Sequence, residues 1–281
     1  MPRSLIKTIL IDMHVHSTYS DGTLSVRSIA RAAKNRHLSL VSLTDHDTTA
    51  GLKPFLSACS EVGVSGLTGI ELSAEANYTL HILGFRIEPG GELEKKLDYI
   101  RERRDTRNEK ICEKLRCLGF DITVEEAKAL SGGQVVARPH IARLMVQKGY
   151  VSSNIEAFIK YIGDQGSAYV PRERLSAEEC ISLIRGAGGL PSLAHPLQTG
   201  LDDEDFEKLL KRLTDAGLWG IEAVYSSHSP EDIYRCLGWA EKFGLYPTAG
   251  SDFHGGNSPN IDLGMPVSED FLPWARLGVK I

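Results

Sequence analysis

The segment ILIDMHVH (residues 9–16) begins as a short apolar run and ends in two histidines, His14 and His16. Residues two apart in a β-strand point to the same side, so a strand ending here would place both imidazoles side by side. Two imidazoles at the end of one strand can share a metal ion. The segment therefore predicts a buried strand whose exit is a candidate metal site.

The same arrangement recurs along the chain, with acidic or histidine side chains just past short apolar runs. Seven runs rich in Val, Ile and Leu look like buried strands, at about residues 8–13, 38–43, 64–69, 78–84, 189–194, 219–224 and 245–249. They are almost continuously apolar, which favours a parallel sheet covered by helices. Helix-length segments lie between most of them, so we expect an α/β barrel whose catalytic residues gather at one mouth.

The polar groups after these runs suit a transition metal. They are His14, His16, Asp21, the triplet Asp45-His46-Asp47, Glu71, His81, His195, Asp252 and His254. Imidazole together with carboxylate favours Zn, Mn or Fe over Ca, and there is no cysteine in the set. The set is too large for one ion and suggests two or three. The pattern indicates a metal-dependent hydrolase.

The amino-acid composition limits the partners and the compartment that we expect for this protein. The 281 residues carry a net charge of −5, which gives no sign of bulk affinity for nucleic acid or membranes. The five cysteines form no C-x-x-C pair, so we expect a reducing compartment. No apolar stretch is long enough to span a bilayer. We expect a cytoplasmic protein without a membrane association or an obligate protein partner.

The alternation of strands and helices breaks between about residues 92 and 165, where the patterns are helical. We expect a barrel domain formed by residues 1–91 and 166–281, with residues 92–165 as a helical insertion that caps the active-site mouth. The first helix of this segment, residues 93–118, interleaves basic and acidic side chains. Local charge pairing favours a solvated helix, and a phosphate-tracking surface is the alternative.

Six stretches, in chain order, resemble the motifs of one family. They are DMHVHSTYSDGTLS (12–25), LVSLTDHDTTAG (40–51), GIELSA (69–74), LHILGF (80–85), LAHP (193–196) and AGSDFHG (249–255). Together they resemble the PHP (polymerase and histidinol phosphatase) superfamily of metal-dependent phosphoesterases. The branch that is most similar dephosphorylates nucleoside 3′,5′-bisphosphates and includes 5′-to-3′ exonucleases on short RNA. The resemblance implies a distorted seven-stranded (β/α) barrel with three metal ions, expected to be Mn²⁺, although Zn²⁺ or Fe²⁺ would suit the same ligands.

The resemblance also implies how the ligands are shared. His14, His16, Glu71 and Asp252 would hold the first metal; Glu71, His81 and His195 the second; Asp21, His46 and His254 the third. Asp45 and Asp47 are expected to orient His46 or its neighbours. In such sites a carboxylate holds two metals close together, and a bridging hydroxide formed near neutral pH attacks phosphorus.

Substrate contacts are less specific in the sequence. Arg138 and His140 open a helix of the insertion, where both would bind a substrate phosphate; a surface ion pair of Arg138 is the alternative. His228 follows a strand and would contact substrate or protonate the leaving group, as would His140; a solvated histidine explains His228 equally well. Glu222, inside a strand pattern, is expected to be a buried, hydrogen-bonded carboxylate.

These residues lead us to expect a phosphomonoesterase that acts on small nucleotides, removing the 3′-phosphate of nucleoside 3′,5′-bisphosphates. Three alternatives remain open. The first is a 5′-to-3′ exonuclease acting on short RNA or oligonucleotides, and the second is a histidinol phosphatase. The third is a non-catalytic metal-binding module, which the complete ligand set disfavours.

Overall fold

The computed structural model describes residues 7–130, 136, 138–171 and 174–279. It divides into two compact units: Met1–Lys95 with Leu175–Ile281, and Lys96–Arg174. We call the first the barrel unit and the second the helical unit. None of the described helices is long and apolar enough to cross a membrane.

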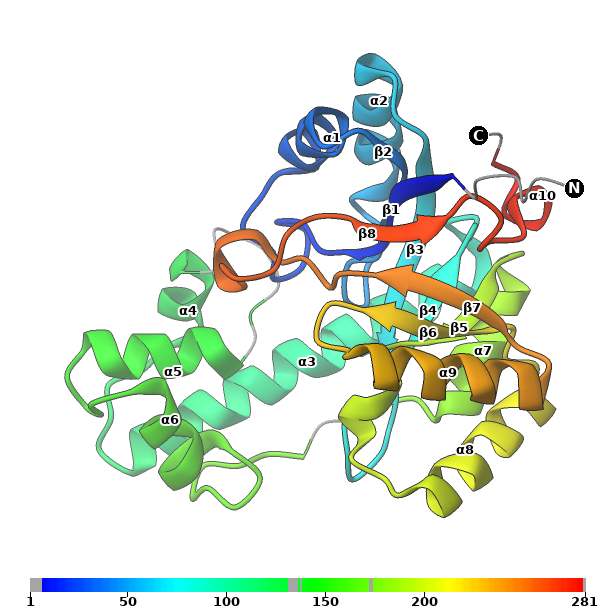
Figure 1. The fold of residues 1–281 in the computed structure, drawn as a ribbon. Helices are drawn as coiled ribbons and strands as arrows, with labels where there is room; N and C mark the ends of the chain where they lie inside the picture. The colour runs from blue at the N-terminus through cyan, green and yellow to red at the C-terminus, as the bar shows by residue number, and fades with distance from the viewer. Residues whose placement is uncertain (1–6, 131–135, 137, 172–173, 280–281) are drawn as a thin grey trace, which may run out of the picture. The chain divides into compact units, whose positions relative to one another are not determined.

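The barrel unit is built on one sheet of eight strands, in the order β7-β6-β5-β4-β3-β2-β1-β8 (Figure 1). The strands are β1 (Thr8–Val15), β2 (Leu38–Leu43), β3 (Gly66–Ser73), β4 (His81–Phe85), β5 (Leu190–Leu193), β6 (Gly220–Tyr225), β7 (Tyr246–Gly250) and β8 (Met265–Ser268). The seven predicted strands correspond to β1–β7, so the α/β barrel prediction is confirmed. The sequence analysis missed β8, a short strand that pairs antiparallel with β1.

The expectation of a parallel sheet is wrong for β4, which runs antiparallel to both β3 and β5. The link between β3 and β4 is short, whereas a parallel crossover needs about a dozen residues or more. Ser73, at the end of β3, pairs with His81, at the start of β4. The reversal therefore brings His81 to the edge where its neighbours end.

Backbone hydrogen bonds close the barrel at this same edge. The amide of Asp252 donates to the His14 carbonyl at 2.9 Å, and the amide of His16 donates to the Phe253 carbonyl at 2.9 Å. Apolar side chains from several strands form a core that includes Ile11, Met13, Leu40, Phe85 and Ala249. The residues that leave β7 are thus fixed directly against the end of β1.

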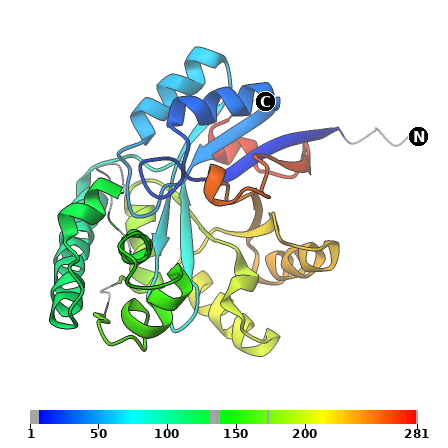
Figure 2. The same ribbon diagram turned by 90° about the vertical axis from the view of Figure 1, so that its left-hand side faces the viewer.

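Helices cover the outside of the strands. They are α1 (Val26–Asn35), α2 (Leu52–Val62), α7 (Ala177–Gly186), α8 (Asp203–Asp215), α9 (Pro230–Phe243) and the short α10 (Trp274–Leu277). Figure 2 shows α1 and α2, in blue, on a different side of the strands from α8 and α9, in yellow and orange. Two short 3-10 turns, η2 (Pro196–Thr199) and η3 (Gly255–Asn257), follow β5 and β7.

Side-chain caps fix the starts of several helices. Ser176 with Glu179 forms a capping box, and Ser229 caps α9 ahead of Pro230. Ser153 caps its helix, but Glu156 bonds to Ser152 instead of completing a box with Ser153.

The helical unit contains most of α3 (Gly91–Cys117), then α4 (Val124–Leu130), α5 (Arg138–Gln147), α6 (Asn154–Ala157) and the π-helical turn η1 (Phe158–Ile162). Its own core includes Ile111, Leu115, Ile141 and Met145. Among its described residues no strand occurs, as the sequence pattern predicted. Its role as a cap on the barrel mouth stays a prediction.

Candidate metal centre

The ends of the strands bring eight of the nine predicted ligands together in three overlapping clusters; the ninth, His195, belongs to none of them. In each, one ligand atom from every residue lies within 4.8 Å of the others. The clusters are His14, His16, Glu71 and Asp252; His16, Asp21, His46 and His254; and His46, Glu71 and His81.

Glu71 lies at the centre and presents its two carboxylate oxygens to different histidines. Its Oε1 is 2.8 Å from His81 Nδ1 and 3.1 Å from His195 Nε2. Its Oε2 is 3.3 Å from His16 Nε2 and 3.4 Å from His14 Nε2. A carboxylate in this position is suited to bridge two cations, as the sequence prediction requires.

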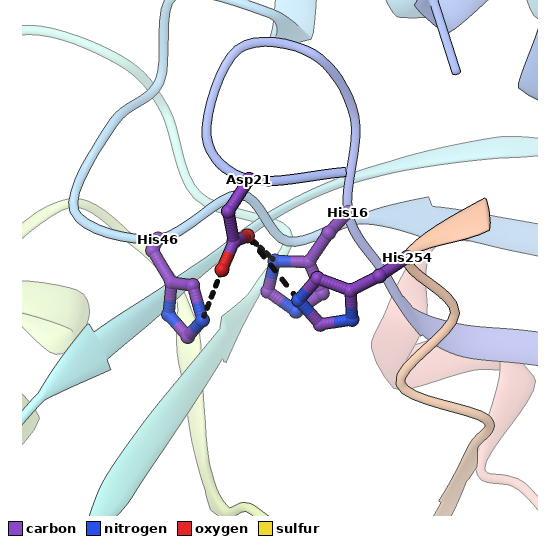
Figure 3. Close-up of side chains that lie close together, drawn as sticks. All are labelled: His16, Asp21, His46 and His254. Carbon is purple, nitrogen blue, oxygen red and sulfur yellow. Dashed lines mark ion pairs between the residues drawn. The ribbon is translucent and has the colours of Figure 1, made fainter. Parts of the chain in front are cut away.

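Asp21 organises the second cluster from the loop that follows β1 (Figure 3). Its carboxylate is 3.2 Å from His254 Nε2 and 3.8 Å from His46 Nε2. The His16 and His254 rings stack with their centroids 4.0 Å apart. The side chains in Figure 3 come from three separate segments and converge on one point.

Several buried polar atoms of these clusters have no hydrogen-bond partner. They include His14 Nε2, His16 Nε2 and Glu71 Oε2. His14 and His16 are fully buried, and Glu71 is 1% exposed. Burying such groups without partners is costly, and nearly all buried polar atoms in proteins are paired. Divalent cations bound to these nitrogen and oxygen atoms would satisfy them, so the residues fit a metal site.

The electrostatics of the centre are those of carboxylates held among histidines. Burial alone would raise the pKa of Glu71, but His46, His81 and His14 outweigh it and lower that pKa well below its usual value. Burial would likewise lower the pKa of His46, yet the Glu71 carboxylate raises it to about 10. The carboxylates are thus kept ionised, which is the form that binds metal.

Asp45 and Asp47 act on different parts of the centre. Asp45 accepts hydrogen bonds from the Ser17 amide at 2.7 Å and from the Ser20 hydroxyl at 2.7 Å. It therefore orders the loop that carries Asp21. Asp47 accepts a hydrogen bond from the Ser73 amide at 3.2 Å, and its charge adds to the causes that raise the pKa of His46.

Unusual backbone conformations are found at three residues of the centre. His195, Asp252 and Asp47 have φ angles of 25°, 59° and 50°. Residues with side chains seldom adopt this left-handed region, and such strain persists where the surrounding structure holds it in place. The strand exits are therefore constrained at the points where they present these side chains.

Sequence reasoning missed two supporting residues. Asp12 is fully buried and accepts hydrogen bonds from the Ser251 hydroxyl at 2.6 Å and the Gly264 amide at 2.8 Å; burial raises its pKa to about 6. An aspartate inside an apolar run was a signal that could have identified it. The Tyr225 hydroxyl donates a hydrogen bond to Asp252 Oδ2 at 3.0 Å, and no sequence motif includes Tyr225.

The predicted substrate residues lie outside the three clusters. Arg138 pairs with Asp164 at 3.0 Å and donates to the Ile162 carbonyl at 3.2 Å, and His140 lies beside it on α5. Their contact with substrate stays a prediction. In the barrel unit, His228 is half-buried and its Nδ1 is 3.0 Å from the Ala223 carbonyl. Glu222 is the buried, hydrogen-bonded carboxylate that was expected.

Comparison with known proteins agrees with this geometry. The model of the PHP domain family matches residues 12–215. A 3′,5′-nucleoside bisphosphate phosphatase of Chromobacterium violaceum is 34% identical over 279 residues, covering 96% of this chain and 97% of that protein. A 5′-3′ exoribonuclease of Haemophilus influenzae is 33% identical over 270 residues, covering 92% of this chain and 98% of that protein.

Solved structures share the fold over the same length. A Bifidobacterium adolescentis protein assigned as a metal-dependent phosphoesterase has a TM-score of 0.80 and 30% identity, covering 96% of this chain and 97% of that one. An amidohydrolase of Chromobacterium violaceum with bound sulfate and no metal has a TM-score of 0.80 and 33% identity, with 95% of each chain covered. The chain belongs to the PHP domain family and is a metal-dependent phosphoesterase.

Proposed function

We propose that this enzyme removes the 3′-phosphate of nucleoside 3′,5′-bisphosphates. The observation that carries the proposal is the position of Glu71, whose two oxygens face two sets of histidines. The similar phosphatase from Chromobacterium violaceum, matched over nearly the whole of both chains, supports this substrate. The proposed compartment is the cytoplasm, which suits a nucleotide substrate and five free cysteines.

Three divalent ions, Mn²⁺ by preference, are proposed to occupy the centre. His14, His16, Glu71 and Asp252 would hold one, Glu71, His81 and His195 a second, and Asp21, His46 and His254 a third. Bound there, the ions would supply Lewis acidity toward the phosphoryl oxygens and lower the pKa of water. Glu71 would keep two of these sites close together, and its side chain, like those of His14 and His16, is buried.

His228 is the proposed proton donor to the leaving alcohol. A carbonyl oxygen can only accept, so the contact with Ala223 places a proton on His228 Nδ1. The proton donated to the leaving alcohol would then be one carried by Nε2. His140 is the second candidate, and wild-type rates in both His228→Ala and His140→Ala would exclude this role for either residue.

The test is phosphate release by the Mn²⁺-loaded protein from adenosine 3′,5′-bisphosphate, 5′-AMP, histidinol phosphate and a 5′-phosphorylated short RNA. We expect the bisphosphate to be the preferred substrate. Preference for histidinol phosphate would contradict the proposal, and bound metal with no turnover on any substrate would indicate a binding module.

A 5′-to-3′ exoribonuclease is the second candidate, favoured by the similarity to the Haemophilus influenzae enzyme. The many basic side chains of α3 are consistent with it, although several of them are already paired, among them Lys95 with Glu92 and Arg101 with Asp98. Release of mononucleotides from RNA, with an affinity that falls steeply with salt, would favour this candidate.

A further inference from the structure

Strand β6 supplies no member of the three ligand clusters, yet two of its side chains contact cluster residues. We propose that Glu222 and Tyr225 are positioning residues, which fix His14, His195 and Asp252 in the orientation that binds metal. The inference rests on the proposed metal sites and adds residues that the family motifs do not include.

Glu222 fixes the tautomer of His14. Its Oε1 is 3.0 Å from His14 Nδ1, and a carboxylate can only accept, so the proton lies on Nδ1. The lone pair is then on Nε2, which is 3.4 Å from both Glu71 Oε2 and Asp252 Oδ1. Carboxylates that accept from the far nitrogen of a metal-binding histidine set its ring orientation in this way.

The second oxygen of Glu222 holds the backbone of His195. Glu222 Oε2 accepts a hydrogen bond from the His195 amide at 2.7 Å. His195 has the strained φ of 25° described above, so this bond stabilises a conformation that the chain would otherwise avoid. One buried carboxylate, 1% exposed, therefore positions ligands from two strand exits.

Tyr225 orients Asp252. The hydroxyl donates to Asp252 Oδ2 at 3.0 Å and accepts from Gln198 Nε2 at 2.8 Å. Asp252 Oδ1 is left facing His16 Nε2 at 3.2 Å.

A local irregularity of β6 lets both side chains reach the centre. Residues three apart in a regular strand point to opposite faces. Here Glu222 pairs with Thr248 and Val224 pairs with Ala249, so β6 has one residue more than β7 at this point. A Cβ at the adjacent Gly250 would overlap the His14 side chain and lie 2.6 Å from Glu222 Oε1, which shows how closely this region is packed.

The test is the affinity of the metal-stripped protein for Mn²⁺, measured by calorimetric titration for the wild type, Tyr225→Phe and Glu222→Gln. We expect each substitution to weaken at least one Mn²⁺ site by about 10- to 100-fold. Tyr246→Phe is the matched control: it removes a tyrosine hydroxyl at the start of β7, the far end of the strand from Asp252, and should bind Mn²⁺ as the wild type does. Thermal unfolding of the stripped variants separates positioning from loss of fold.

Mn²⁺ affinities equal to wild type in both variants would overturn the inference, as would equal weakening in Tyr246→Phe. Weakened Mn²⁺ sites with an unchanged Tm in the stripped protein would support it. If Mn²⁺ binding is weakened as expected but no nucleotide is hydrolysed by the wild type, the inference stands and the proposed function fails. If the wild type binds no Mn²⁺, both fail.

Discussion

The charged side chains of the metal centre, in the barrel unit, and those of the helical unit are arranged in opposite ways. In the barrel unit, His14 and Glu71 are almost completely buried, and one polar atom of each, His14 Nε2 and Glu71 Oε2, has no hydrogen-bond partner. In the helical unit, a typical pair is Lys160 with Glu156, 2.7 Å apart and with the lysine side chain 57% exposed. An exposed pair is satisfied by its partner and by water and contributes little to stability. The buried side chains of the metal centre require a bound ligand, so the functional site is expected in the barrel unit.

The largest effect should come from Glu71→Gln, compared with Glu126→Gln in the helical unit. Loss of the shared negative charge should lower phosphate release by about a thousandfold, because metal catalysis contributes several kcal/mol and each 1.36 kcal/mol is tenfold in rate. Glu126 makes a surface pair with Lys148, and its substitution should leave the rate unchanged. Initial rates at saturating Mn²⁺ provide the measurement. Similar rates in both variants would show that Glu71 is no more important for catalysis than the surface residue Glu126.

Arg138→Ala tests whether the helical unit contributes to substrate binding at all. If Arg138 binds a substrate phosphate, KM for the bisphosphate should rise about 10- to 100-fold, the range for a lost hydrogen bond to a charged group. Asp164→Ala is the matched control, because it removes the partner of Arg138 and leaves the guanidinium in place. An equal, small change in KM for both variants would mean that the arginine only pairs within its own unit.

Once metal is removed, the ionisable groups of the metal centre should make the stability of the protein depend on pH. The raised pKa of His46, about 10, stabilises the fold fully below its unfolded value of 6.5, and this is lost as pH rises toward 10. The lowered pKa of Glu71 stabilises above 4.5 and is lost as pH falls. We therefore expect the Tm of the stripped protein to be highest between about pH 4.5 and 6.5.

Each kcal/mol of unfolding free energy lost in the alkaline range should lower the Tm by about 2–4 °C. Mn²⁺ should reverse that decline, since it binds the neutral imidazole. Thermal melts from pH 5 to 9 provide the measurement, and His46→Gln should flatten the alkaline side. A wild-type Tm that does not change above pH 6.5 would contradict this account.

The smallest effect on activity is expected from chemical labelling of the cysteine thiols. Cys117, at the end of α3, is exposed, whereas the other four cysteines are buried. Burial raises the pKa of Cys112 to about 11 and that of Cys59 to about 12, so both remain unreactive thiols. Mass spectrometry after native alkylation should show one modified cysteine and full activity. Labelling of Cys112 would show that the core of the helical unit opens.

Much of the centre could be predicted because strand geometry links spacing to position. His14 and His16, at the end of β1, have the spacing that puts side chains on one side of a strand, and both belong to the cluster that contains Glu71 and Asp252. Asp252 and His254 have the same spacing, but they lie past the end of β7 and belong to different clusters. The direction of β4 was missed, although the link that precedes it is too short for a parallel crossover and could have indicated an antiparallel strand. The role of Tyr225 could not be predicted, since its position depends on an irregularity of β6 that no residue type indicates.

The barrel unit is discontinuous in the chain, and this affects the order in which the site can be assembled during translation. His14, His16, Glu71 and His81 precede the helical unit, whereas His195 and Asp252 follow it. At roughly 5–20 residues per second, the early ligands leave the ribosome well before Asp252 is made. The cluster of His14, His16, Glu71 and Asp252 cannot exist in a nascent chain that has not passed the end of β7. Metal bound there would mark a chain whose synthesis has gone far enough to close the barrel.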